Sequence, residues 1–82
     1  MTEQEHLRRL GAFLKKCREE AGLSQRALES DVNLTSGRIS EIEQGKRNIQ
    51  YGTLVRLLGA YNLSLTDFFG QLEKYTVPKK KS

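Results

Sequence analysis

One short segment of this sequence combines residues that suit hydrogen bonding and close approach to a ligand. Between Thr35 and Gly45 the only large apolar residues are Ile39 and Ile42, three positions apart. The other residues are mostly small or polar, and at helical spacing many of them share one broad side. They are Ser36, Gly37, Ser40, Glu41 and Gln44. Thr is a good helix cap and Gly a common helix stop, so the segment is predicted to be a helix with little apolar surface.

Basic side chains follow this polar segment directly. From position 44 to position 66 the chain has no acidic residue, whereas Lys46, Arg47 and Arg56 are present. The net charge of +4 is less informative, because Lys79–Lys81 supply three of the four charges. The placement of charge therefore predicts a locally positive surface beyond the end of the polar segment.

The sequence gives little support for catalytic or metal-binding chemistry. The chain has one cysteine, Cys17, and one histidine, His6, which argues against a disulfide, a zinc site and an assembled nucleophile and base. We expect no enzymatic activity, no cofactor, no metal and a buried structural role for Cys17. A chain of 82 residues has a modest core, so no small-molecule ligand is expected. The sequence lacks a membrane-spanning apolar run and a signal peptide, so we expect a soluble, cytoplasmic protein without a membrane partner.

Apolar periodicity predicts five helices and no strand. The apolar positions of these helices span residues 7–21, 27–32, 39–42, 54–61 and 65–72. Residues that tolerate left-handed backbone follow the first three helices, and they are Gly22, Asn33 and Gly45. The connecting turns are short, so we expect a compact all-α, five-helix bundle. We assign residues 1–76 to this single domain and residues 77–82 to a disordered basic tail.

The second and third predicted helices explain the polar segment. A helix of eight residues, a turn of three and a helix with one thin apolar edge make a helix-turn-helix. In that motif Ile39 and Ile42 anchor helix 36–44, whose opposite side enters the major groove of DNA as the recognition helix. Gly is unfavourable inside a helix, but at position 37 it is tolerable if a larger side chain would collide with a phosphate or a base. Taken alone, the segment fits a solvated surface helix with an incidental Gly equally well.

Three short motifs lie within Leu23–Ile49, and they are Leu23-Ser-Gln25, Ile39-Ser-Glu-Ile-Glu43 and Gly45-Lys-Arg-Asn-Ile49. On these motifs the sequence resembles the Cro-type, xenobiotic-response-element-like (XRE-like) helix-turn-helix family of phage repressors and bacterial regulators. The family resemblance implies a lambda-repressor-like DNA-binding domain. Leu63-Ser-Leu-Thr-Asp-Phe-Phe69 is similar to the family's fifth helix, so the resemblance covers about residues 7–72. Within the family, the sequence is most similar to the restriction-modification controller proteins.

The resemblance implies roles for individual residues. Base contacts are expected from Ser36, Gly37, Arg38, Ser40 and Arg47. Phosphate contacts are expected from Ser24, Gln25, Lys46 and Asn48. Arg47 is suited to read guanine because its planar guanidinium can donate to two acceptors on one base edge. For Arg38 the alternative to a base contact is a side chain that faces solvent or binds a phosphate. Glu43 matches a Glu that forms a structural ion pair with an Arg of the first helix, here Arg18.

Two positions depart from the family pattern. Asn33 replaces the customary Gly of the turn, which is a small change because Asn adopts left-handed backbone more readily than most residues. Glu29 replaces an Ala where the second and third helices pack. A buried carboxylate needs a partner, which Arg26, Arg38 or the edge of the motif must supply.

The same resemblance predicts a sequence-specific transcriptional regulator that binds double-stranded DNA. Two copies should bind a pseudo-palindromic operator, because one small domain offers few base contacts. The homodimer is expected to form through an apolar patch on the fifth helix, made of Leu65, Phe68, Phe69, Leu72 and Tyr75. The alternative for the two Phe rings is that both belong to the core of the monomer. The alternative function is a protein-interaction module or antitoxin built on the same fold.

Overall fold

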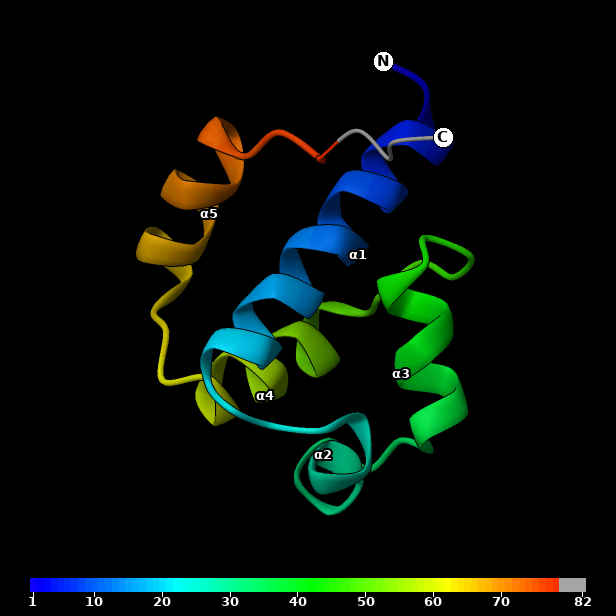
Figure 1. Ribbon diagram of the computed structural model, residues 1–82, viewed down its shortest axis with the longest axis vertical. Helices are drawn as coiled ribbons and strands as arrows, with labels where there is room; N and C mark the ends of the chain where they lie inside the picture. The colour runs from blue at the N-terminus through cyan, green and yellow to red at the C-terminus, as the bar shows by residue number, and fades with distance from the viewer. Residues whose placement is uncertain (79–82) are drawn as a thin grey trace.

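The computed structural model describes residues 1–78 and contains five α-helices (Figure 1). They are α1 (Glu3–Glu20), α2 (Gln25–Val32), α3 (Ser36–Glu43), α4 (Tyr51–Ala60) and α5 (Leu65–Lys74). Residues 1–78 contain no strand, so the predicted all-α, five-helix class is confirmed. None of these helices has the length and apolar character needed to cross a membrane. Most of the predicted basic tail, residues 79–82, lies outside the described residues, and the domain division at residue 76 stays a prediction.

Four of the five helices begin at a hydroxyl side chain that accepts a hydrogen bond from a backbone N–H of the first turn. These residues are Thr2, Ser24, Thr35 and Ser64. At α1 the Glu5 carboxylate also accepts from the backbone N–H of Thr2, which completes a capping box. Such caps satisfy N–H groups that have no partner within the helix.

The first four helices each end with a residue in the left-handed region of backbone space. The residues and their φ angles are Gly22 (74°), Asn33 (55°), Gly45 (76°) and Asn62 (58°). After α1, the N–H of Leu23 returns to the carbonyl of Arg18 at 3.1 Å, and α3 and α4 end with the same type of bond. This hydrogen bond is the signature of a Schellman motif. The three stops predicted at positions 22, 33 and 45 are confirmed.

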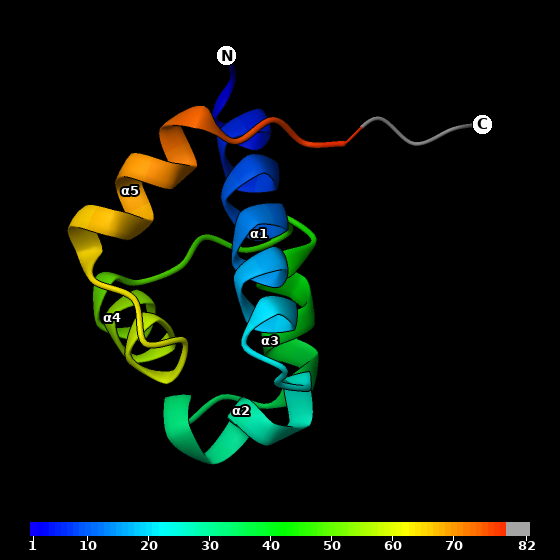
Figure 2. The same cartoon turned by 60° about the vertical axis from the view of Figure 1, so that its left-hand side comes forward.

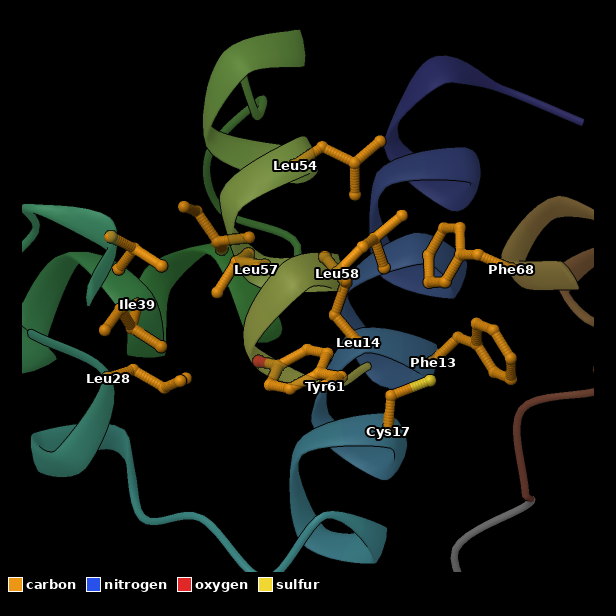
Figure 3. Close-up of a cluster of buried hydrophobic side chains, with 12 residues drawn as sticks. Phe13, Leu14, Cys17, Leu28, Ile39, Leu54, Leu57, Leu58, Tyr61 and Phe68 are labelled. Atoms are coloured by element: carbon orange, nitrogen blue, oxygen red, sulfur yellow. The ribbon is translucent and has the colours of Figure 1, made fainter. Parts of the chain in front are cut away.

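The helices enclose one apolar core (Figures 1 and 2). Its buried members come from all five helices, and Figure 3 shows Phe13 and Leu14 of α1 facing Phe68 of α5 and Leu58 of α4. The ring centroids of Phe13 and Phe68 lie 5.2 Å apart. Cys17 is 5% exposed, so the expected burial of this side chain is confirmed. Both ribbon views place α2 at the end of the molecule farthest from the N-terminus.

Two glycines allow α1 to lie unusually close to the end of α3. A Cβ atom on Gly11 would overlap the carbonyl oxygen of Ile42 and lie 2.7 Å from that of Glu43. A Cβ atom on Gly45 would lie 2.7 Å from the Cα of Arg8. The local sequence indicates a helix-ending role for Gly45 and gives no sign of the close contact at Gly11. The two residues fix the distance between α1 and the helix that carries the predicted DNA contacts.

Candidate nucleic-acid interface

The site is built on α2, the turn Asn33–Thr35 and α3. Leu28 and Val32 bury one side of α2, while Ile39 and Ile42 bury the thin apolar edge of α3. α2 packs against both α3 and α4, so α3 is held from behind. α3 also packs against α1 and lies along one flank of the molecule in Figure 1. The side of α3 that faces away from α1 and α2 carries exposed residues.

α3 carries four of the five predicted base-contacting residues, and the fifth, Arg47, follows it. Gly37 and Arg38 are exposed, and Ser36 and Ser40 are half-buried. A Cβ atom on Gly37 would meet only the hydroxyl of Thr35, at 3.9 Å, so internal packing does not require Gly there. This leaves room for another molecule to approach the first turn of α3.

Two of the predicted base contacts come from side chains that are already oriented by neighbours. The Ser40 hydroxyl accepts a hydrogen bond from Gln44 Nε2 at 2.8 Å, which leaves its own O–H free to donate. Arg47 Nε donates to Glu41 Oε1 at 2.8 Å, and both side chains are 46% exposed. The hydrogen bond from Arg47 lowers the pKa of the Glu41 carboxyl, so Glu41 is ionised at neutral pH.

A shallow hollow of about 200 Å³ separates α3 from the start of α4. Arg38, Arg47 and Asn48 all line it, together with apolar side chains such as Ile42 and Ile49. The structure thus brings three predicted DNA contacts from two segments to one hollow. The neighbouring Lys46 is also exposed.

The remaining predicted phosphate contacts make hydrogen bonds within the protein. Ser24 caps α2 by accepting from the N–H of Ala27 at 3.0 Å. Gln25 Nε2 donates to Glu43 Oε1 at 3.0 Å, and Asn48 Oδ1 accepts from the N–H of Ile49. A Ser hydroxyl and an amide nitrogen each keep a further N–H or O–H to donate, so these bonds do not prevent phosphate binding.

Arg18 and Glu43 form a buried pair that joins α1 to the end of α3. Arg18 Nε donates to Glu43 Oε2 at 2.8 Å, and Nη2 donates to Oε1 at 3.2 Å. Arg18 Nη1 also donates to the carbonyl of Leu23 at 2.7 Å. The hydrogen bond with Glu43 raises the pKa of Arg18, so this guanidinium stays charged. Together with Gln25, the pair links α1, the start of α2 and α3 in one network.

Glu29 has a partner that sequence reasoning missed. Its Oε2 accepts a hydrogen bond from the backbone N–H of Ser36, at the start of α3, with the atoms 2.6 Å apart. The side chain is half-buried, so the expected full burial was wrong. The partners left open were Arg26, Arg38 or the edge of the motif, and the structure shows neither arginine but a backbone group of the motif itself. The first N–H groups of a helix have no partner within it, and they attract negative charge. A carboxylate placed shortly before a predicted helix start was the available signal.

The residues predicted at the dimer interface divide into two groups. Phe68 is fully buried and packs on Phe13, so its assignment to the interface was wrong. Phe69 is 44% exposed, and Leu65, Leu72 and Tyr75 are half-buried against the core. The end of α5 is tied to α1 because the Arg9 side chain donates hydrogen bonds to the backbone carbonyls of Leu72 and Tyr75.

A second hollow, of about 520 Å³, lies between the start of α1, the end of α3 and the residues after α5. Its charged groups are largely engaged within the protein. Glu5 accepts from Thr2, Arg9 donates to carbonyls near the end of α5, and Glu43 pairs with Arg18. We assign no ligand to this hollow, because few of its polar groups are left to orient one.

Comparison with known proteins places this geometry in a family. Residues 9–68 match the family described as "Helix-turn-helix domain". The chain belongs to this helix-turn-helix family. Membership implies DNA binding and confirms the XRE-like resemblance on which the residue assignments were based.

The relatives of this helix-turn-helix domain are regulators of transcription and controller proteins, which are not enzymes. The HTH-type transcriptional regulator PuuR of Escherichia coli (strain K12) is 42% identical over 69 residues, which cover 84% of this chain. The chain spans 37% of the length of PuuR. The control protein C.MunI of Mycoplasma sp is 34% identical over 67 residues, covering 80% of this chain and 90% of C.MunI.

Solved structures show the same arrangement of helices. The wild-type restriction-modification controller protein C.Esp1396I has a TM-score of 0.75 and 32% identity, covering 83% of this helix-turn-helix domain and 90% of that chain. The clp gene regulator ClgR from Corynebacterium glutamicum has a TM-score of 0.76, covering 90% of this domain and 91% of its own chain. At 23% identity, ClgR supports the fold alone.

Proposed function

We propose that this helix-turn-helix domain is a transcriptional regulator that binds a pseudo-palindromic operator as a homodimer, with α3 in the major groove. One observation carries the proposal. Ile39 and Ile42 hold α3 in the core by a narrow edge, whereas the opposite side presents an open Gly37 and an exposed Arg38 beside the basic loop that follows α3. Small and polar residues at the start of a recognition helix allow close approach to base edges.

The base contacts in this proposal are Ser36, Gly37, Arg38, Ser40 and Arg47. Gly and Ser offer little direct readout, so the two Arg side chains and the shape of the DNA supply most of the sequence preference. Ser24, Gln25, Lys46 and Asn48 bind phosphates and orient the domain. The two half-sites are centred about one helical turn apart, roughly 34 Å, which matches a twofold-symmetric dimer.

The direct test is selection of bound duplexes from random DNA, followed by affinity measurements at increasing salt. We expect one enriched, pseudo-palindromic sequence. Proteins with roughly six to ten phosphate contacts lose about 10³- to 10⁵-fold in affinity between 50 and 200 mM salt, and we expect a loss of that order. A chain that enriches no sequence and shows no salt-dependent binding would instead be a protein-interaction module.

A further inference from the structure

We propose that Glu41 is a positioning residue that holds Arg47 for base recognition and increases sequence specificity at the expense of affinity for random DNA. The proposal rests on the function proposed above. Glu41 was not among the residues assigned to DNA contact, and it does not need to touch DNA in this role. It acts through the side chain of Arg47.

The geometry of the pair leaves the recognition end of Arg47 available. Glu41 accepts a hydrogen bond from Nε, at 2.8 Å, which lies on one edge of the guanidinium. Within residues 1–78 the two Nη atoms make no other hydrogen bond, so four N–H groups remain in one plane. Guanine presents two acceptors side by side in the major groove, and this end of the guanidinium matches them.

Glu41 also holds the backbone from which Arg47 projects. Its carbonyl accepts a hydrogen bond from the N–H of Lys46 at 2.9 Å, across the left-handed turn at Gly45. The Glu41 carboxylate accepts a hydrogen bond from the side chain of Arg47, the residue after Lys46. One helical residue thus restrains both the loop and the guanidinium. Restraint before binding reduces the freedom that a long side chain loses in the complex.

The charge of Glu41 gives the pair its selectivity. An ionised carboxylate on the DNA-facing helix repels phosphates whatever the base sequence. The charge of Glu41 therefore opposes binding to all DNA, and this loss is more than offset only where the oriented Arg47 gains a guanine. The expected result is a larger difference between the affinity for the preferred duplex and the affinity for random DNA.

The test uses the duplex enriched by the wild type and a scrambled duplex of equal length. We expect Glu41→Gln to weaken binding of the enriched duplex roughly tenfold while leaving the scrambled duplex unchanged or more tightly bound. In an Arg47→Ala background, Glu41→Gln should no longer change the ratio of the two affinities. Repeating the selection with Glu41→Gln should relax the preference at the same base pair as Arg47→Ala.

Glu19→Gln is the matched control, because Glu19 is an exposed carboxylate on α1 and its loss changes the net charge equally. It should leave the ratio of affinities unaltered, and thermal melting should show all variants folded. Three results for Glu41→Gln would overturn the role of Glu41: an equal rise in affinity for both duplexes, an unchanged ratio of the two affinities, or tighter binding of the enriched duplex alone. A wild type that enriches no sequence would overturn the proposed function itself, which separates the two failures.

Discussion

At the scale of single residues, Gly11 has the tightest surroundings of the glycines. We expect Gly11→Ala to reduce the free energy of unfolding by roughly 2 to 3 kcal/mol, the upper part of the range for overpacked sites. The reason is that the new Cβ meets backbone carbonyl oxygens of Ile42 and Glu43, which cannot rotate away as a side chain would. Urea denaturation measures the change.

Gly59→Ala provides the control for Gly11→Ala. Gly59 lies in α4, and a Cβ atom placed there meets nothing within 4 Å. Ala is the better helix former, so this variant should be neutral or more stable by up to about 1 kcal/mol. Equal stability of the two variants would mean that α1 and α3 do not approach as closely as described.

Arg18 carries the second prediction at this scale. Its side chain is 10% exposed and that of Glu43 is 4% exposed, so Arg18→Ala leaves a carboxylate buried without its main partner. Removal of one member of a buried pair typically lowers stability by about 3 to 5 kcal/mol, enough to unfold a marginal domain. Thermal melting followed by circular dichroism measures this loss.

The exposed pair of Lys16 and Glu20 is the comparison for Arg18→Ala. These side chains are 50% and 64% exposed, with the charged atoms 3.5 Å apart. Glu20→Gln should change stability by less than about 1 kcal/mol. If Arg18→Ala and Glu20→Gln have the same melting temperature, the buried pair contributes far less to stability than its geometry indicates.

At the scale of the elements, the start of α3 depends on a residue of α2. Glu29 accepts from the first N–H of α3, in addition to the cap that Thr35 provides. Loss of a cap typically costs about 0.5 to 2 kcal/mol, and we expect Glu29→Ala to fall in that range. Asp31→Ala, which removes an exposed carboxylate from the same helix, should stay within about 0.5 kcal/mol of the wild type. Chemical denaturation of both variants decides whether the bond between the helices is stabilising.

The elements also show which local predictions succeed. Thr35, Asn33 and Gly45 mark the bounds of α2 and α3 in the structure, as the sequence indicated. Caps and left-handed stops act over three to five residues, so local sequence determines them. The partner of Glu29 depends on how two helices cross, which local patterns do not define.

At the scale of the whole molecule, the proposed homodimer makes Phe69 the most informative position. Phe69 is 44% exposed on α5, and its ring packs edge-on against the buried Phe68. We expect the wild type to sediment as a dimer at micromolar concentration and Phe69→Ser to sediment as a 9.4 kDa monomer with weaker operator binding. Analytical ultracentrifugation measures both masses.

Val55→Ser is the matched control, since Val55 is a similarly exposed apolar side chain (42%) on α4. It should leave the dimer intact. A mass of 9.4 kDa for the wild type at every concentration would exclude the dimer proposed through α5.

The sequence alone determined the five helices, the stops of the first three, the helix-turn-helix and the family, because hydrophobic periodicity, caps and motif spacing are local properties. Adjacent positions on a helix lie about 100° apart, so Phe68 and Phe69 face different ways, but local pattern does not say which ring enters the core. Only the tertiary structure decided that Phe68 is internal, that Gly11 meets α3 and that Glu41 holds Arg47. Each of these depends on the distance and angle between segments, and those follow from packing across the whole core.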